Sequence, residues 1–159
     1  MESSRIRTLA EVVGVVAVVG SLVFVGLEIR QNAEATRAAT VQEVTDGWRE
    51  WSAATATNPE AVEALEGVLS HDDFAEADPV ALRLAQQGVV TQLTILANAH
   101  YHYRQGLLPA EFWEANQRIL GAGFGGSSRV ADLWRWTWER VSGAYPEPFQ
   151  ELVDSILAR

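Results

Sequence analysis

The chain has 159 residues, of which 48% are hydrophobic and 21% charged, so most of it is expected to fold around a core. Its net charge is −9, and an acidic surface repels phosphate backbones, which argues against nucleic acid as a partner. Because the chain has no Cys, disulfides, zinc–thiolate sites and iron–sulfur clusters are excluded.

The first predicted element is a helix that crosses a membrane, from Leu9 to Ile29. Within it, residues 12–27 read VVGVVAVVGSLVFVGL and carry no charge. At 1.5 Å per residue the helix spans about 31 Å, close to the thickness of the hydrocarbon of a bilayer. A buried core helix is less favoured, because such helices usually show a polar stripe and this segment shows none.

A cleaved signal peptide is a further alternative for the same segment. The basic start at Arg5 and Arg7 suits it. However, the apolar run is too long, and Glu28 and Arg30 come before the only small-x-small sequence, at residues 33–35. The sequence therefore favours an uncleaved membrane helix.

Small side chains recur along one side of this helix at a spacing of three and four residues. Such a stripe lets the backbone of a second helix approach closely. Gly and Ala are common in membrane helices, so a plain anchor stays open as the alternative. The predicted helix-packing interface consists of Ala10, Gly14, Ala17, Gly20 and Ser21.

The charges that flank the membrane segment do not decide its orientation. Arg5 and Arg7 precede it, and Arg30 and Arg37 follow it. Because orientation follows the excess of basic residues on one side, this tie leaves the orientation open.

The helical pattern continues past the membrane segment to about Thr57. Residues 28–57 contain no Pro, and apolar positions recur at helical spacing up to a seam at Val41, Val44, Trp48 and Trp51. We therefore expect one long helix, with Arg30 and Glu34 paired across one turn. The predicted organisation is an N-terminal arm at 1–8, a transmembrane helix at 9–29 and a soluble acidic helical domain at 30–159.

Two helix starts follow, each with a capping residue before a Pro. Asn58-Pro59 opens a short helix to about Leu69, and Asp78-Pro79 opens a longer one to about Gln105, where Gly106 ends it. Residues 70–77 between them form an acidic loop. Positions seven apart in the longer helix indicate a core seam: Leu82, Val89, Leu96 and Tyr103.

Three more helices complete the chain. One begins at Pro109 and ends near Leu120, and a flexible Gly-rich loop follows at residues 121–128. Ser127 or Ser128 caps the next helix, which ends at about Ser142, and Pro146 or Pro148 begins the last one. Since no segment alternates as strands do, the predicted fold is all-α, with a helical bundle packed on the long helix.

The six Trp residues indicate both core and contact positions. Trp48 and Trp51 share the face of the long helix, and Trp134 and Trp138 share a face of the fifth helix, so these four are expected in the core. Trp136 lies on the opposite face. Because Trp is favoured at protein interfaces, Trp136 is the predicted protein contact.

No catalytic, cofactor or metal site is predicted from the remaining motifs. The loop GAGFGG at 121–126 matches G-x-G-x-x-G, but the dinucleotide fold needs a strand before this loop and here a helix precedes it. A flexible connection is favoured, with an anion at the following helix start as a lesser alternative, near Ser127, Ser128 and Arg129.

The three histidines are not arranged as metal ligands. His100 and His102 are two residues apart on a helix, so they point about 200° apart. His102 is instead placed to pair with Asn98 at i, i+4. His71 precedes a loose set of oxygen ligands whose convergence nothing in the sequence indicates: Asp72, Asp73 and Glu76.

Several pieces of the chain resemble a group of small bacterial proteins that have one N-terminal membrane helix and a helical domain. The pieces are GLEIRQN at 26–32, NPEAVEAL at 58–65, YHYRQGLLPAEFWE at 101–114, and the Trp-rich segment followed by PFQELVDSIL at 148–157. The resemblance implies the same architecture, a single pass through the bacterial inner membrane, and no assigned activity. It also favours the cytoplasmic side for the domain, because members often have a less basic N-terminus.

These observations predict a non-catalytic, membrane-anchored accessory or scaffold subunit. Its expected partners are membrane lipid and other transmembrane chains or a second copy of itself. The alternative is a membrane-anchored sensory or ligand-binding module, which predicts an apolar pocket with a few polar groups. An enzyme, which predicts clustered titratable groups with shifted pKa values, is least favoured.

Overall fold

A computed structural model describes the backbone of residues 2–158 and the side chains of residues 13–158. Residues 2–158 form six α-helices and two short 3₁₀ turns and include no strand, which confirms the predicted all-α class for this part of the chain. The chain divides into two compact units, Met1–Ala39 and Thr40–Arg159, and each is described by itself.

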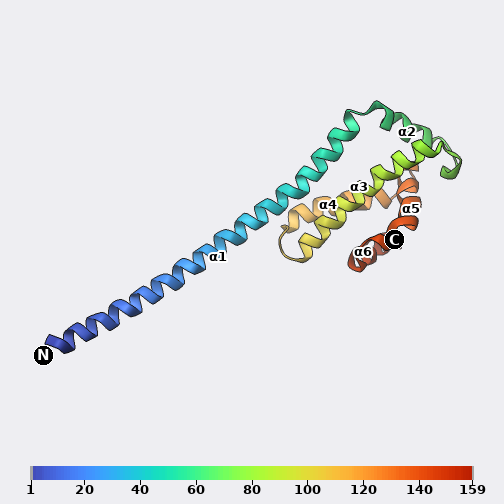
Figure 1. Cartoon of the computed structure of the whole chain (residues 1–159). Helices are drawn as coiled ribbons and strands as arrows, with labels where there is room; N and C mark the ends of the chain where they lie inside the picture. Colours follow the sequence, from blue (N-terminus) through green and yellow to red (C-terminus); the bar gives the residue numbers. More distant parts are fainter. Residues whose placement is uncertain (1, 159) are drawn as a thin grey trace. The chain divides into compact units, whose positions relative to one another are not determined.

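Helix α1 covers Glu2–Ala56 without interruption (Figure 1). The predicted continuity between Arg30 and Thr45 is therefore confirmed. The helix begins earlier than expected, so residues 2–8 are part of it. It ends before Asn58, which caps the next helix, because Pro59 has no backbone N–H with which to continue α1.

In the first unit, every side chain from 13 to 39 is exposed. This part of α1 begins with a window of mean hydropathy 2.0, none of it buried, and α1 is long and apolar enough to cross a membrane. A core helix of a soluble protein would have most of that window buried. Arg30 Nε donates to Glu34 Oε1 at 3.1 Å, which confirms the predicted pair.

Helices α2 and α3 begin at the capping residues that the sequence indicated. Helix α2 covers Pro59–Leu69, and Asn58 accepts a hydrogen bond from the backbone N–H of Ala61. Helix α3 covers Pro79–Arg104, and Asp78 accepts from the N–H groups of Val80 and Ala81. Gly106 follows α3 with a φ of 72°, a conformation that glycine adopts without strain.

The segment between α2 and α3 is more ordered than a plain acidic loop. It contains the 3₁₀ turn η1, Phe74–Glu76, which Asp73 caps by accepting from the N–H of Ala75 at 2.9 Å. Phe74 and Ala77 are buried. The acidic side chains therefore lie on a turn that two apolar residues attach to the core.

Helix α4 is longer than predicted, because it covers Ala110–Phe124 and so runs past Leu120 into the Gly-rich segment. The reason is packing rather than local propensity. A Cβ at Gly123 would lie 2.5 Å from ring atoms of Trp134, so glycine lets the helix meet that indole directly. Phe124, one residue later, is buried with its ring edge against Trp134 at 5.4 Å between centroids.

The last two helices follow short turns. Helix α5 covers Arg129–Val141, and Ser128 rather than Ser127 caps it by accepting from the N–H of Ala131. The 3₁₀ turn η2, Ser142–Ala144, leads to helix α6, Glu147–Leu157, with Pro146 at its N-cap.

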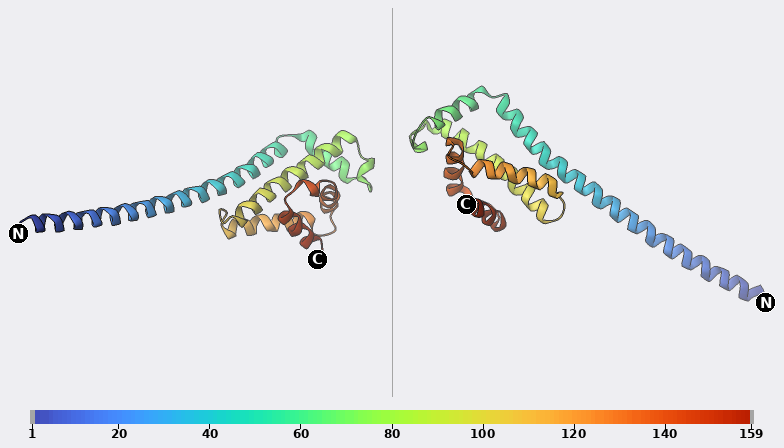
Figure 2. Two further views of the ribbon diagram at one scale, coloured as in Figure 1. Left: turned by 60° about the horizontal axis from the view of Figure 1, so that its bottom comes forward. Right: turned by 180° about the vertical axis from the view of Figure 1, so that it is seen from behind.

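Helix α3 packs against four other helices of the second unit, α2, α4, α5 and α6. Figure 2 shows α4 running back beside α3 after a short turn. The largest core cluster forms around α3, and a smaller one includes the α1 residue Val44. Of the predicted α3 seam, Val89 and Leu96 are buried, whereas Tyr103 is 39% exposed and stacks on Trp113.

The Trp residues divide differently from the prediction. Trp134 and Trp138 are buried, 3% and 4% exposed, as expected. Trp48 is half-buried and packs against both core clusters. Trp51 is also half-buried and belongs to neither cluster, so its assignment to the core was wrong. Trp48 and Trp51 lie one turn apart on α1, and Trp51 lies at the edge of the core.

The close contact at Gly123 generates a test of the packing. We expect Gly123→Ala to lower the free energy of unfolding by about 1–3 kcal/mol, because the methyl group overlaps the Trp134 ring. Gly121→Ala is the matched control in the same helix, since a Cβ there meets nothing within 4 Å. It should be neutral or stabilise by up to about 1 kcal/mol. Thermal unfolding followed by circular dichroism compares the two, and equal effects would contradict the contact.

Candidate functional site

The predicted helix-packing interface lies on an exposed part of α1. Gly14, Ala17, Gly20 and Ser21 are all exposed, and a Cβ at either glycine would meet nothing within 4 Å. The side chain of Ala10 lies outside the described residues. Ser21 Oγ donates to the carbonyl oxygen of Ala17 at 2.8 Å, so the hydroxyl is satisfied inside the helix. The surface is thus open to a neighbour, and its role as an interface stays a prediction.

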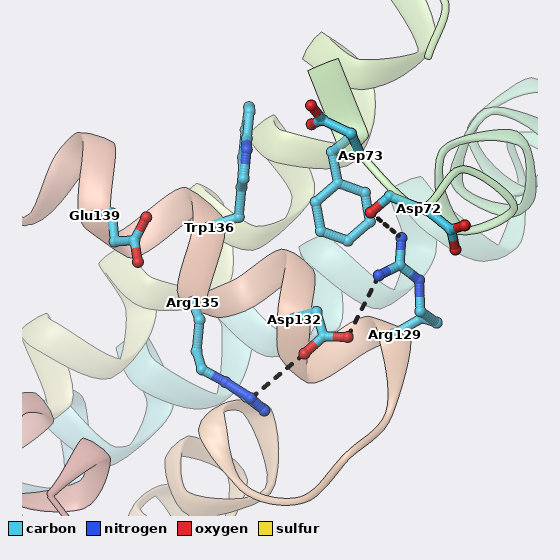
Figure 3. A pocket seen from close by; sticks show the side chains of 8 residues that line it. Asp72, Asp73, Arg129, Asp132, Arg135, Trp136 and Glu139 are labelled. Carbon is cyan, nitrogen blue, oxygen red and sulfur yellow. Dashed lines mark hydrogen bonds and ion pairs between the residues drawn. The ribbon is translucent and has the colours of Figure 1, made fainter. Parts of the chain in front are cut away.

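Trp136, the predicted protein contact, is half-buried on α5 rather than fully exposed. The guanidinium carbon of Arg140 lies 3.6 Å from the centroid of its ring, and the ring of Phe74 meets it at 6.1 Å and 81°. Its indole lines a pocket together with Phe74 of η1 and with Asp73, the N-cap residue of that turn. Figure 3 labels Trp136 and Asp73 at this pocket. This pocket has a volume of about 320 Å³.

Two of the arginines that line this pocket donate hydrogen bonds to other parts of the protein. Arg129 donates to the carbonyl oxygens of His71 and Asp72 and to the carboxylate of Asp132. Arg135 Nη2 donates to the carbonyl oxygen of Gly126 at 2.6 Å, and its Nη1 lies 3.5 Å from Asp132. Both arginines therefore tie loops to α5. An anion site near Arg129 was a lesser alternative from the sequence, but the guanidinium of Arg129 donates instead to acceptors of the protein itself.

The described histidines are separated, as their spacing indicated. His71 Nδ1 lies 2.9 Å from the carbonyl oxygen of Gly67. His100 packs between the rings of Trp113 and Phe149, at 5.1 and 5.8 Å between centroids. Among residues 13–158, no three His, Asp or Glu side chains are grouped so as to hold a metal ion.

His102 does not pair with Asn98 as the sequence suggested. Both side chains instead face Glu43 on α1. Asn98 Nδ2 donates to Glu43 Oε1 at 3.0 Å, and His102 Nε2 lies 3.8 Å from Glu43 Oε2. The carboxylate from a distant part of the chain is the stronger acceptor, and only the tertiary structure brings it near.

The G-x-G-x-x-G match does not form a nucleotide-binding loop. Its first four residues belong to the end of α4, and the described part of the chain contains no strand that could precede it. Gly126 has a φ of 82° and its carbonyl oxygen is held by Arg135. The segment is a structural connection between α4 and α5.

Two largely apolar grooves were not predicted. One, of about 600 Å³, lies between α3 and residues 144–146. The other, of about 440 Å³, lies between the last turns of α1, the start of α2 and α3. Ile95 lines both. A signal for the second was Gly88, a helix-interior glycine in a segment otherwise rich in good helix formers.

No family model, curated protein or solved structure matches the chain. The resemblance to small bacterial membrane proteins therefore remains an expectation, and the function has to be argued from the residues.

The surroundings of His100 shift its pKa. Burial, and then the positive charge of Arg104, lower the pKa of His100 below its usual 6.5. The unfolded chain consequently binds a proton at a higher pH than the folded chain does. The free energy of unfolding should therefore fall as the pH drops through 6.5 towards the folded-state pKa.

We expect His100→Gln to flatten this pH dependence and Arg104→Gln to reduce it, because the charge of Arg104 is the second cause of the shift. Thermal unfolding between about pH 7.5 and pH 5.5 provides the comparison. Any loss of ring packing in His100→Gln acts at every pH, so the slope and not the midpoint is the readout. An unchanged slope in His100→Gln would show that His100 does not carry the effect.

Proposed function

We propose that the chain is a non-catalytic, membrane-anchored accessory or scaffold subunit of a larger membrane complex or of a homo-oligomer. In this proposal a single helix over residues 9–29 crosses the bacterial inner membrane, and the acidic domain at 30–159 is a helical bundle on its cytoplasmic side. One observation carries it: every side chain of α1 from 13 to 27 is exposed, and none of them is charged.

Burial of this surface is the physical requirement behind the proposal. Transfer of apolar area out of water is favourable by about 25 cal/mol per Å², so a surface of this size is stable only against lipid or another chain. A single helix satisfies its own backbone hydrogen bonds, which is what hydrocarbon demands of a spanning segment. The back-bonded hydroxyl of Ser21 meets the same demand.

The small side chains support a role beyond anchoring. An anchor needs only length and hydrophobicity, whereas Gly14, Ala17 and Ser21 recur on one side of the exposed helix. Lipid offers no hydrophobic drive between helices, so association there depends on close van der Waals packing, which small side chains allow. Partners are accordingly lipid and other transmembrane chains or a second copy of this chain.

A second candidate function is a membrane-anchored ligand-binding module. The observation that favours it is the pair of apolar grooves of about 600 and 440 Å³, within the size range of small-molecule sites. The two candidates are compatible, because one concerns α1 before Thr40 and the other concerns the compact unit after it.

The helix interface can be tested by making the same change, Gly to Leu, at two positions that lie on different sides of α1. Gly14→Leu should disrupt assembly, because its side chain fills the stripe at which a second helix packs. Gly26→Leu is the matched control: it makes the same change in the apolar segment, twelve positions on, where 100° per residue places it away from the stripe. A Cβ at either glycine meets nothing within 4 Å, so neither change disturbs the chain itself.

Co-purification and light scattering of the full chain in one mild detergent provide the measurement. The wild type and Gly26→Leu should retain a partner or a second copy, and Gly14→Leu should lose it while still inserting into membranes. A wild-type protein that is monomeric and alone, or an unaffected Gly14→Leu variant, would reduce the helix to an anchor.

Trp136 is the second proposed contact. We expect Trp136→Ala to weaken co-purification of the partner, because large half-buried aromatic side chains contribute strongly to interfaces. The control is Trp138→Ala, which should instead lower the free energy of unfolding of the domain by about 3–5 kcal/mol. The reason is that Trp138 is fully packed against Phe124, Tyr145 and Phe149. Equal destabilisation by both changes, with co-purification intact for Trp136→Ala, would assign Trp136 to the core.

A further inference from the structure

The ring of His100 on α3 lies between aromatic rings of two other helices. Its centroid is 5.1 Å from that of Trp113 on α4 and 5.8 Å from that of Phe149 on α6. Phe149 also meets the rings of Trp138 and Tyr145, at 6.0 and 5.7 Å between centroids. Trp113 and Phe149 are buried, whereas the imidazole is half-buried. A side chain of the type that gains a proton near neutral pH is therefore part of the contact between α3, α4 and α6.

Helix α6 is attached to the rest of the domain by apolar contacts. Its fully buried residues are Phe149 and Val153. Gln150 and Ser155 donate to carbonyl oxygens no more than five residues away, and among the described residues no side chain of α6 forms a hydrogen bond or ion pair with another helix. Helix α4 differs, because a side chain of α1 donates to Asn116. The loss of a few apolar contacts is thus enough to release α6.

A proton on His100 opposes the docking of α6. Burial, and then the positive charge of Arg104, lower the pKa of His100 below 6.5, so the charged ring fits its position between the two helices less well than the neutral ring does. The charged residues of α4 and α6 are exposed and do not reverse this direction: Glu111, Glu114, Arg118, Glu147, Glu151 and Asp154.

The direction of the pH dependence follows from solvation of the ring. When α6 separates, His100 loses the cover of Phe149 and gains water, which moves its pKa back towards 6.5. The separated state therefore binds a proton at a higher pH than the docked state does. Separation is favoured as the pH falls below 6.5, and the effect is complete below the pKa of the docked state. Arg104 lies on α3 beside His100 in both states, so its charge acts on both alike.

We propose that His100 makes the docking of α6 sensitive to pH, so that the domain holds this helix at neutral pH and releases it at acidic pH while its other helices stay folded. The released state uncovers Phe149 and Val153, which are buried when α6 is docked. The apolar surface that the domain presents therefore differs between the two conditions. The inference depends neither on the helix interface at Gly14 nor on a ligand.

Hydrogen exchange of the full chain in lipid nanodiscs measures the release. Exchange of the backbone amides of α6 is followed by mass spectrometry between about pH 7.5 and pH 5.5 and corrected for the intrinsic rate at each pH. Peptides from α2 report global unfolding in the same sample. In the wild type the protection of α6 should fall at least about threefold over this range, and the protection of α2 should fall less.

Two histidine variants test which group is responsible. His100→Phe keeps an aromatic ring between Trp113 and Phe149 and removes the group that titrates, so the protection of α6 should be the same at both ends of the pH range. His102→Phe is the matched control, because it makes the same change two residues further along α3, where the imidazole lies near Glu43 of α1. This control should retain the wild-type response of α6.

Arg104→Gln distinguishes release of α6 from global unfolding. Because Arg104 stays beside His100 when α6 separates, the variant should move the response of α6 to higher pH without changing its size. Global unfolding separates the two residues, so its pH dependence should become smaller in the same variant. A response of α6 that shrinks together with that of global unfolding would contradict a local release.

Three other results would overturn the proposal. Protection of α6 that does not change with pH in the wild type would mean that no release occurs. Protection that rises at acidic pH would mean that the rings of Trp113 and Phe149 favour the charged imidazole, as cation–π contacts do. An equal fall for α2 and α6, or an unchanged response in His100→Phe, would assign the effect to global unfolding or to other groups.

Discussion

Trp48 joins the last part of α1 to the helices that follow it. Its indole packs against both core clusters, and its N–H donates to Asn116 on α4, whose own amide donates to the carbonyl oxygen of Phe112. Both polar groups of the buried Asn116 are thus satisfied, which avoids the cost of an unpaired buried amide. The second unit depends on this contact because α1 otherwise brings it only Val44 as a fully buried apolar side chain.

The other helices are arranged by close contacts to aromatic rings and by arginines that hold loops. Gly123 lets α4 meet Trp134 on α5, and Trp138 contacts Phe124 and Phe149, which joins α4, α5 and α6 in one core. Arg129 then ties the turn before α3 to the start of α5. Apolar area supplies the stability, and the exposed ion pairs of these arginines add little to it.

The proposed functions follow from what this packing leaves uncovered. The apolar side chains of residues 13–27 of α1 are exposed, whereas the unit after Thr40 leaves two grooves beside α3. The proposed anchoring and helix association therefore involve other residues than the proposed ligand binding.

The sequence alone determined which segments are helical and where most of them begin. The capping pairs Asn58-Pro59 and Asp78-Pro79 act locally, and the apolar run before Ile29 needs no tertiary contact to be recognised. Local signals are readable because each helix start satisfies its own backbone N–H groups with a neighbouring side chain. The buried state of Trp134 and Trp138 also followed, since helical spacing places both on one face.

Only the tertiary structure decided how far α4 extends, which partner His102 meets and where Trp51 lies. In each case the determining group is distant in sequence: the Trp134 ring against Gly123, Glu43 beside His102, and α3 across from Trp51. The groove at Gly88 was invisible for the same reason. A cavity is the space that separate helices fail to fill, so it depends on how they pack and not on the periodicity of any one of them.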